Sequence, residues 1–211
     1  MTTNYAQIER QALAVLMDAL GPDAPTLCEG WTTKDMAAHL VVRESRPDAA
    51  LGIVASPFAK YAEKIRAQYA KRDFHPLVDA VRNGPPLLSP TKIAPVDKLI
   101  NTVEFFVHHE DVLRAQPNAK PRELPADEMQ QLEAALRRMA KLFLRKAPCG
   151  VTLAIAGAEP LIAKTAEPMV TISGNAAEIL MFVEGRQAHA KVTLDGPADA
   201  ASALSAASFG I

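Results

Sequence analysis

Apolar side chains recur at helical spacing near the start of the chain. The first run ends at the helix-stopping pair Gly21-Pro22 and comprises Ile8, Ala12, Val15, Leu16 and Ala19. Thr32 then has the features of an N-cap, because Asp35 follows three residues later as the partner of a capping box. The pattern therefore predicts one helix before Gly21 and a second that begins near Thr33.

Proline and glycine mark the ends of the helices predicted next, which cover residues 57–72, 76–82, 95–116 and 126–146. The segment 83–95 is rich in both residue types and is interpreted as a loop, for which a plain connector is a more common role than a lid. Four long helices with proline-marked joints favour a helical bundle.

The pattern changes after Gly150. Short apolar and β-branched runs separated by glycine or proline predict strands at 151–157, 160–165, 169–174 and 190–196. Helices are predicted over 175–184 and 198–207. We therefore expect an α+β protein with a helical bundle over residues 1–147 and a small α+β domain over residues 148–211.

Composition and charge narrow the classes of partner. The chain has 211 residues, 49% of them hydrophobic, which is enough to bury a full core. Its 23 basic and 24 acidic residues give a net charge of −1 and form no basic stripe, which argues against nucleic acid and anionic lipid as partners. The sequence shows neither a signal-peptide pattern nor an apolar run of membrane-spanning length. We expect a cytoplasmic enzyme or binding protein.

The two cysteines, Cys28 and Cys149, lie in unrelated contexts without a CxxC spacing, which favours a reducing compartment. Either thiol is interpreted first as a small buried side chain. Cys28 has the greater interest for function because it lies just before the second predicted helix.

A polar stripe runs along the long helix after Pro95. At 100° per residue, its members fall within an arc of about 80°, and they are Asn101, Glu104, His108 and Asp111. Apolar residues border the stripe, so it does not have the surroundings of a solvated helix face. A buried polar stripe is costly unless something satisfies it, and a metal ion in a wet cavity would do so.

Glu104 and His108 lie one helical turn apart, so both side chains can reach one ion. A third ligand must come from another helix, and His39 in the second predicted helix is the candidate. His109 points about 100° away from this stripe and is the weaker candidate. The alternative is that these histidines are ordinary core residues, because a Glu-x-x-x-His pair is a weak motif by itself.

Other polar residues near the predicted ligands suggest a substrate site. Arg43 and Arg46 share the face of His39 and could hold a substrate carboxylate, although an exposed, solvated role is an equal alternative. Asn101 and Asp111 are further candidate substrate-binding residues on the polar stripe. Asp35 could orient His39, but the capping role is the stronger interpretation.

Two segments resemble a known family. The strings CEGWTTKDMAAHL, from Cys28 to Leu40, and NTVEFFVHHED, from Asn101 to Asp111, are similar to signatures of the mycothiol-dependent maleylpyruvate isomerase family, within the DinB-like metal-binding superfamily. The resemblance is strongest to an actinobacterial group of uncharacterised metal-binding proteins in that family. It implies a DinB-like four-helix bundle followed by a small sterol-carrier-like α+β domain.

The resemblance also implies the chemistry. It assigns a divalent ion, usually zinc, to His39, Glu104 and His108, and it implies mycothiol as cosubstrate and an electrophile as second small-molecule partner. A thiol bound to such an ion is deprotonated and becomes a nucleophile at neutral pH. The expected function is a metal-dependent thiol transferase or isomerase, with maleylpyruvate itself a doubtful substrate because the sequence departs from the true isomerases outside the ligand motifs.

Alternatives remain at the sequence level. A bound water instead of a thiol would make a metal-dependent hydrolase, and a protein that only holds a metal or small molecule would not be an enzyme. Iron is an alternative metal, because two histidines and one carboxylate form the facial set of iron oxygenases. Nickel or another divalent ion is a further alternative.

Overall fold

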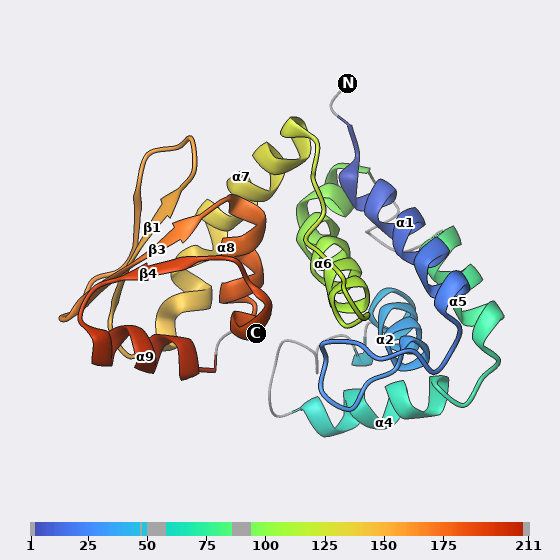
Figure 1. Ribbon diagram of the computed structural model, residues 1–211. Helices are drawn as coiled ribbons and strands as arrows, with labels where there is room; N and C mark the ends of the chain where they lie inside the picture. Colours follow the sequence, from blue (N-terminus) through green and yellow to red (C-terminus); the bar gives the residue numbers. More distant parts are fainter. Residues whose placement is uncertain (1–2, 47, 50–57, 86–93, 209–211) are drawn as a thin grey trace. The chain divides into compact units, whose positions relative to one another are not determined.

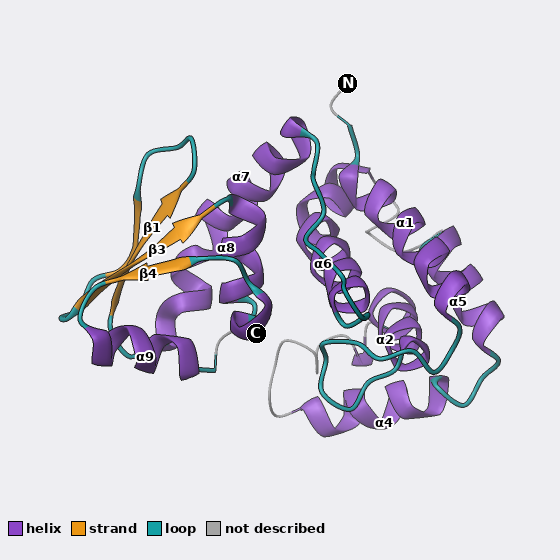
Figure 2. Ribbon diagram, in the orientation of Figure 1, coloured by secondary structure: helices purple, strands orange, loops and turns teal. Residues whose placement is uncertain are grey.

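The computed structural model describes residues 3–46, 48–49, 58–85 and 94–208, with the side chains of 94–96, 99 and 100 excluded. The chain separates into two compact units, Met1–Arg122 and Glu123–Ile211. Figure 1 follows the chain through both units, and Figure 2 distinguishes helices from strands. The N-terminal unit is helical and the C-terminal unit mixes helices with one sheet, so the predicted α+β class is confirmed.

Five described helices build the N-terminal unit, namely α1 (Tyr5–Leu20), α2 (Thr33–Ser45), α4 (Ala59–Tyr69), α5 (Phe74–Asn83) and α6 (Ala94–Arg114). Their main apolar core joins α1, α2, α5 and α6 and includes Leu13, Met17, Met36, Leu40, Leu77, Val78, Phe105 and Val112. Complete burial of a leucine or phenylalanine side chain contributes roughly 1.5–3 kcal/mol. This core therefore fixes α2 and α6, the two helices that carry the candidate site.

Helix α1 lies where the sequence predicts it, but only part of the apolar stripe used for that prediction faces the core. Ile8 and Val15 are 46% and 63% exposed. The buried face instead carries Glu9 and Arg10 beside Leu13. These charged residues are buried because distant partners neutralise them: Arg10 donates to both oxygens of Glu44 and lies over the Phe105 ring. Because a hydrophobicity pattern counts Arg10 as polar, it does not place this side chain on the buried face.

Where the structure describes the predicted helix ends, they agree to within a few residues. The capping box of α2 is complete, with the Thr32 side chain accepting from the Asp35 amide and the Asp35 carboxylate accepting from the Thr32 amide. The helix predicted over 57–72 corresponds to α4, and the piece predicted over 76–82 lies within α5. Most of the predicted 83–95 loop lies outside the described residues. No described helix is both long and apolar enough to cross a bilayer.

The C-terminal unit begins with α7 (Ala126–Phe143) and a short 3-10 turn, η3 (Leu144–Lys146). It continues through β1 (Gly150–Ile155), β2 (Leu161–Lys164), β3 (Met169–Gly174), α8 (Ala176–Val183), η4 (Gln187–His189), β4 (Thr193–Asp195) and α9 (Ala198–Ala206). The strand order is β2-β1-β3-β4, with β1 and β3 parallel and the outer pairs antiparallel. The strands and helices predicted after Gly150 are all present.

Helix α7 belongs to the C-terminal unit by its contacts. It packs on α8 and β2 through a face that includes Leu132, Leu136 and Phe143. By contacts the chain therefore divides after Arg122, whereas the domain boundary at residue 147 stays a prediction.

Candidate metal centre

The candidate site lies between α2 and α6 of the N-terminal unit. The capping box fixes the start of α2, which places His39 in the second turn of that helix. On α6, residues Asn101, Glu104, His108 and Asp111 recur at intervals of three and four, so they share one face of the helix. All four are buried or half-buried. The helical period thus brings the polar stripe to face α2.

The three predicted ligands converge on each other. Nε2 of His39 lies 3.4 Å from Oε1 of Glu104, and Nε2 of His108 lies 3.2 Å from the same oxygen. One donor atom from each residue lies within 4.8 Å of the other two. The His39 and His108 rings meet edge to face with centroids 5.1 Å apart. The structure therefore brings together all three side chains singled out in the sequence.

These donor atoms fit a small divalent ion. Ligand bonds of about 2.0–2.1 Å in a tetrahedron separate neighbouring donor atoms by roughly 3.3 Å, close to the two observed nitrogen-to-oxygen distances. Nδ1 of His108 lies 2.9 Å from Oδ2 of Asp111, which pairs this nitrogen with the carboxylate and leaves Nε2 facing Glu104. Two imidazoles and one carboxylate form a donor set suited to zinc, with room for another ligand. That they hold an ion remains a prediction.

Arg43 reaches the cluster, but it contacts protein groups there. Its Nε lies 3.0 Å from Oε1 of Glu104, and its Nη1 donates to Oδ1 of Asn101 at 2.6 Å. Asn101 in turn donates to Asp97 and Glu44. Asn101 thus holds Arg43 against Glu104, and Asp111 orients His108. Whether Arg43, Asn101 or Asp111 also touches a substrate stays a prediction.

Two other candidates from the sequence, Arg46 and Asp35, have partners outside the three predicted ligands. Arg46 pairs with Asp48 at 2.7 Å and lies within hydrogen-bond reach of the Tyr61 hydroxyl, in an exposed cluster. Asp35 caps α2 and pairs with Arg66. Their contacts agree with the exposed role considered for Arg46 and with the capping role favoured for Asp35.

The pKa values of the three predicted ligands are shifted in different directions. Burial lowers the pKa of His39, which therefore stays neutral. Burial opposes the charge of Glu104, but Arg43, His108 and His39 outweigh it and hold the pKa of Glu104 well below its usual value. Burial also opposes the charge of His108, yet hydrogen bonds to Asp111, Cys28 and Glu104 raise its pKa well above the ordinary value. His108 is thus the one of the three side chains whose positively charged form its surroundings favour.

A family model described as the mycothiol maleylpyruvate isomerase N-terminal domain matches residues 6–148. The chain belongs to this family. The match covers both helices of the candidate site and extends through α7.

Two solved structures have the same fold. The crystal structure of a mycothiol-dependent maleylpyruvate isomerase aligns with a TM-score of 0.61 at 14% identity, over 90% of each chain. A histidine-to-alanine mutant of a mycothiol-dependent maleylpyruvate isomerase aligns with a TM-score of 0.60 at 13% identity, again over 90% of each chain. At these identities the likeness establishes the fold of nearly the whole chain. No curated protein sequence matches this chain.

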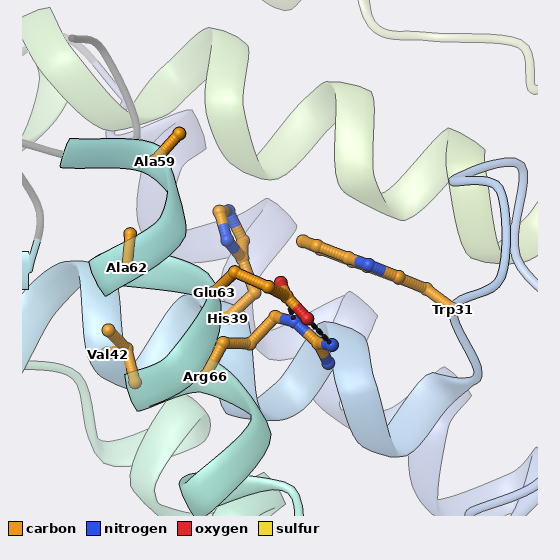
Figure 3. Close-up of a pocket in the computed structure, with 7 residues that line it drawn as sticks. All are labelled: Trp31, His39, Val42, Ala59, Ala62, Glu63 and Arg66. Atoms are coloured by element: carbon orange, nitrogen blue, oxygen red, sulfur yellow. Dashed lines mark hydrogen bonds and ion pairs between the residues drawn. The ribbon is translucent and has the colours of Figure 1, made fainter. Parts of the chain in front are cut away.

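In this member of the mycothiol maleylpyruvate isomerase family, a pocket opens beside His39. It is lined by Trp31, His39, Val42, Ala59, Ala62, Glu63 and Arg66 and has a volume of about 190 Å³. Figure 3 shows Trp31 across the pocket from Ala59, Ala62 and Val42, with His39 between them. The Trp31 and His39 rings lie 5.1 Å apart. A molecule in this pocket therefore lies next to a predicted metal ligand.

Sequence reasoning missed Glu63 and Arg66 because nothing in the spacing of α4 relates it to α2 or α6. The signal that was available is Trp31, the single tryptophan of the chain, which directly precedes the α2 cap. Cys28, noted in the sequence, also lies at the site. Its thiol donates to Oδ2 of Asp111 at 3.4 Å, and with His108 and Asp111 it forms a second group of candidate donors.

Proposed function

We propose that this protein is a divalent-metal-dependent enzyme that uses a low-molecular-weight thiol, mycothiol or a close analogue, to isomerise or conjugate a small electrophile. The observation that carries the proposal is the convergence of His39, Glu104 and His108 from two helices onto one point. Family membership supports the same chemistry, because the two structural relatives are described as mycothiol-dependent maleylpyruvate isomerases.

His39 and His108 would hold the ion through Nε2 and Glu104 through a carboxylate oxygen. When bound, zinc supplies a Lewis acid that lowers the pKa of a thiol or water at its open position. Asp111 fixes the His108 tautomer by accepting from Nδ1. Arg43 holds the Glu104 carboxylate in place and offsets part of its charge. The protein thus sets the orientation of the donors before any ligand arrives.

The surroundings of the cluster suit a reaction between two small molecules. The pocket beside His39 offers a place for the electrophile, while the thiol would occupy the open position next to the three ligands. The half-buried state of Glu104, whose side chain is 23% exposed, leaves an approach for that thiol.

The test is a thiol-dependence assay with spectroscopy of the cobalt-substituted protein. We expect that mycothiol produces a thiolate-to-metal absorption band and that turnover of a cis-configured, conjugated electrophile requires both metal and thiol. A chelator should abolish the reaction. Thiol-independent hydrolysis without the absorption band would instead identify a metal-dependent hydrolase, and a protein with metal but without either activity would be a binding protein.

A matched pair of histidine variants separates loss of the site from general damage. His39→Ala should abolish turnover. His75→Ala should retain it, because the side chain of His75 is 80% exposed on α5 and lies in no candidate donor group of the described residues. Equal activity of both variants would remove the metal cluster from the mechanism.

A further inference from the structure

The pocket beside His39 is small and mostly apolar. Trp31, Val42, Ala59 and Ala62 supply its apolar walls, as Figure 3 shows. Its volume of about 190 Å³ lies below the roughly 300–1,000 Å³ of sites that hold drug-sized ligands. It therefore has room for one end of a small molecule, lying against the Trp31 ring, and not for a whole thiol cofactor.

Among the described residues that line this pocket, the cation is Arg66, and it is already neutralised. Arg66 pairs with Asp35 through Nη1 and donates to Glu63 through Nη2 and, at 2.8 Å, through Nε. Its guanidinium carbon lies 4.8 Å from the centre of the Trp31 ring. The hydrogen bond with Arg66 lowers the pKa of Glu63, and the bond with Glu63 raises the pKa of Arg66, so both stay charged. Two carboxylates thus surround one guanidinium.

Arg43, the neighbouring cation on α2, is engaged as well. It contacts Glu104 and Asn101 and is not among the residues that line the pocket. A carboxylate placed in the pocket would therefore lie against apolar walls and near the surplus negative charge of Glu63 and Asp35. An unpaired charge in such surroundings is strongly disfavoured.

We infer that the pocket receives an uncharged, apolar end of the electrophile, so that this protein prefers electrophiles with at most one carboxylate over dicarboxylates. The inference rests on the proposed function and specifies its substrate class. One carboxylate or carbonyl can still approach the predicted ion beside His39. The second end of the molecule, which occupies the pocket, must be neutral.

Trp31 makes the pocket observable without turnover. Because the chain has a single tryptophan, the ¹⁵N-labelled protein gives one indole N–H signal, which reports on the surroundings of Trp31. The zinc-loaded protein is titrated with monomethyl succinate and with succinate, two unreactive compounds that share one carboxylate and differ at the other end. We expect monomethyl succinate to shift the signal at concentrations about tenfold lower or more. Equal or tighter binding of succinate would overturn the inference.

Turnover is measured separately with monomethyl maleate and maleate in the presence of thiol, each relative to its uncatalysed rate. Preferential isomerisation of the monoester supports both the inference and the proposed function. If neither compound reacts while monomethyl succinate still binds preferentially, the pocket assignment stands and the proposed function fails. If maleate reacts faster and succinate binds better, the proposed function stands and the pocket assignment is wrong.

Two charge variants test the cause of the preference. Glu63→Gln removes one of the two carboxylates around Arg66 and should reduce the preference for the monoester about threefold or more. Glu133→Gln removes a similar helical partner from Arg137 in the C-terminal unit and should leave the preference unchanged. An unchanged preference in Glu63→Gln would show that surplus charge does not govern the pocket.

Discussion

His108 and His109 are neighbours in the chain, yet they lie in two different kinds of polar cluster. Both are buried, and both have Nδ1 hydrogen-bonded to a carboxylate, at 2.9 Å from Asp111 and 2.8 Å from Glu9 respectively. Because successive helical residues differ by about 100°, His108 faces α2 whereas His109 faces α1. His108 meets two more donor atoms there, and His109 meets an ionic network.

The two clusters differ in how their charge is balanced. Around His109, Glu9 and Glu110 both contact Arg122, and Glu110 also contacts Arg114. In these contacts two carboxylates face two arginines. Around His108, Glu104 contacts Arg43, while Asp111 accepts from His108 and Cys28. A buried histidine with a carboxylate partner therefore does not by itself mark a metal site; the two further donor atoms near Nε2 of His108 distinguish it from His109.

Disrupting the His109 cluster should have the largest effect of the changes considered. It should lower the free energy of unfolding and leave zinc binding unchanged. Glu9→Gln removes the carboxylate that accepts two hydrogen bonds from Arg122, and the loss of one partner from a buried ion pair costs about 3–5 kcal/mol. Denaturant unfolding would measure the loss in the free energy of unfolding, and zinc titration would show unchanged affinity.

Glu133→Gln is the matched control for that change. Its half-exposed pair with Arg137 is of a type that contributes about 0.3–0.5 kcal/mol. If Glu9→Gln weakens zinc binding as much as it weakens folding, the two clusters are not independent and the comparison fails.

Disrupting the His108 cluster should have the opposite result and weaken zinc binding. His39→Ala removes one of three predicted ligands, so zinc affinity should fall by more than the roughly 10–100-fold that loss of an outer hydrogen-bond partner costs. His75→Ala should bind zinc normally, since that side chain is exposed on α5. Metal content after dialysis measures both. Unchanged zinc stoichiometry in His39→Ala would remove His39 from the site.

The sequence predicted the His108 cluster because the patterns that identify it lie within single helices. The intervals among Asn101, Glu104, His108 and Asp111 repeat the helical period, and the Thr32–Asp35 capping box fixes the register of His39. The same reasoning did not place Arg10 on the buried face of α1, because its partner on α2 lies 34 residues away. The pocket on α4 was missed for a similar reason: the Arg66–Asp35 pair joins residues 31 apart. Periodicity identifies a face but not what that face meets.

Asp111→Asn should give a smaller effect than loss of a ligand. The substitution keeps the size of the buried side chain but removes the charge that orients His108 and raises the basicity of its Nε2. Loss of such an outer partner costs roughly 10–100-fold in metal affinity. Competition with a chromophoric chelator would measure it, with circular dichroism to check the fold. Affinity equal to that of the unaltered protein would mean that Asp111 serves only the structure.

The pH dependence of zinc binding should give the smallest effect and the finest test. Burial opposes a proton on His108, but Asp111, Cys28 and Glu104 raise the pKa of that residue well above its ordinary value. The proton must leave before Nε2 binds an ion, so zinc affinity should fall about tenfold for each pH unit below that pKa and level off above it. His39, whose pKa is lowered, should add nothing near neutral pH.

The stability of the metal-free protein should change with pH in the opposite direction. Stability from protonated His108 is fully present below the pKa of the unfolded state and is lost as pH rises through the raised pKa of the folded state. Asp111→Asn lowers that folded pKa, so it should extend the level region of zinc affinity to lower pH. Unfolding curves and zinc titrations across the same pH range would test both statements. A zinc affinity independent of pH would mean that no proton leaves His108, and the distinction from His109 would then rest on geometry alone.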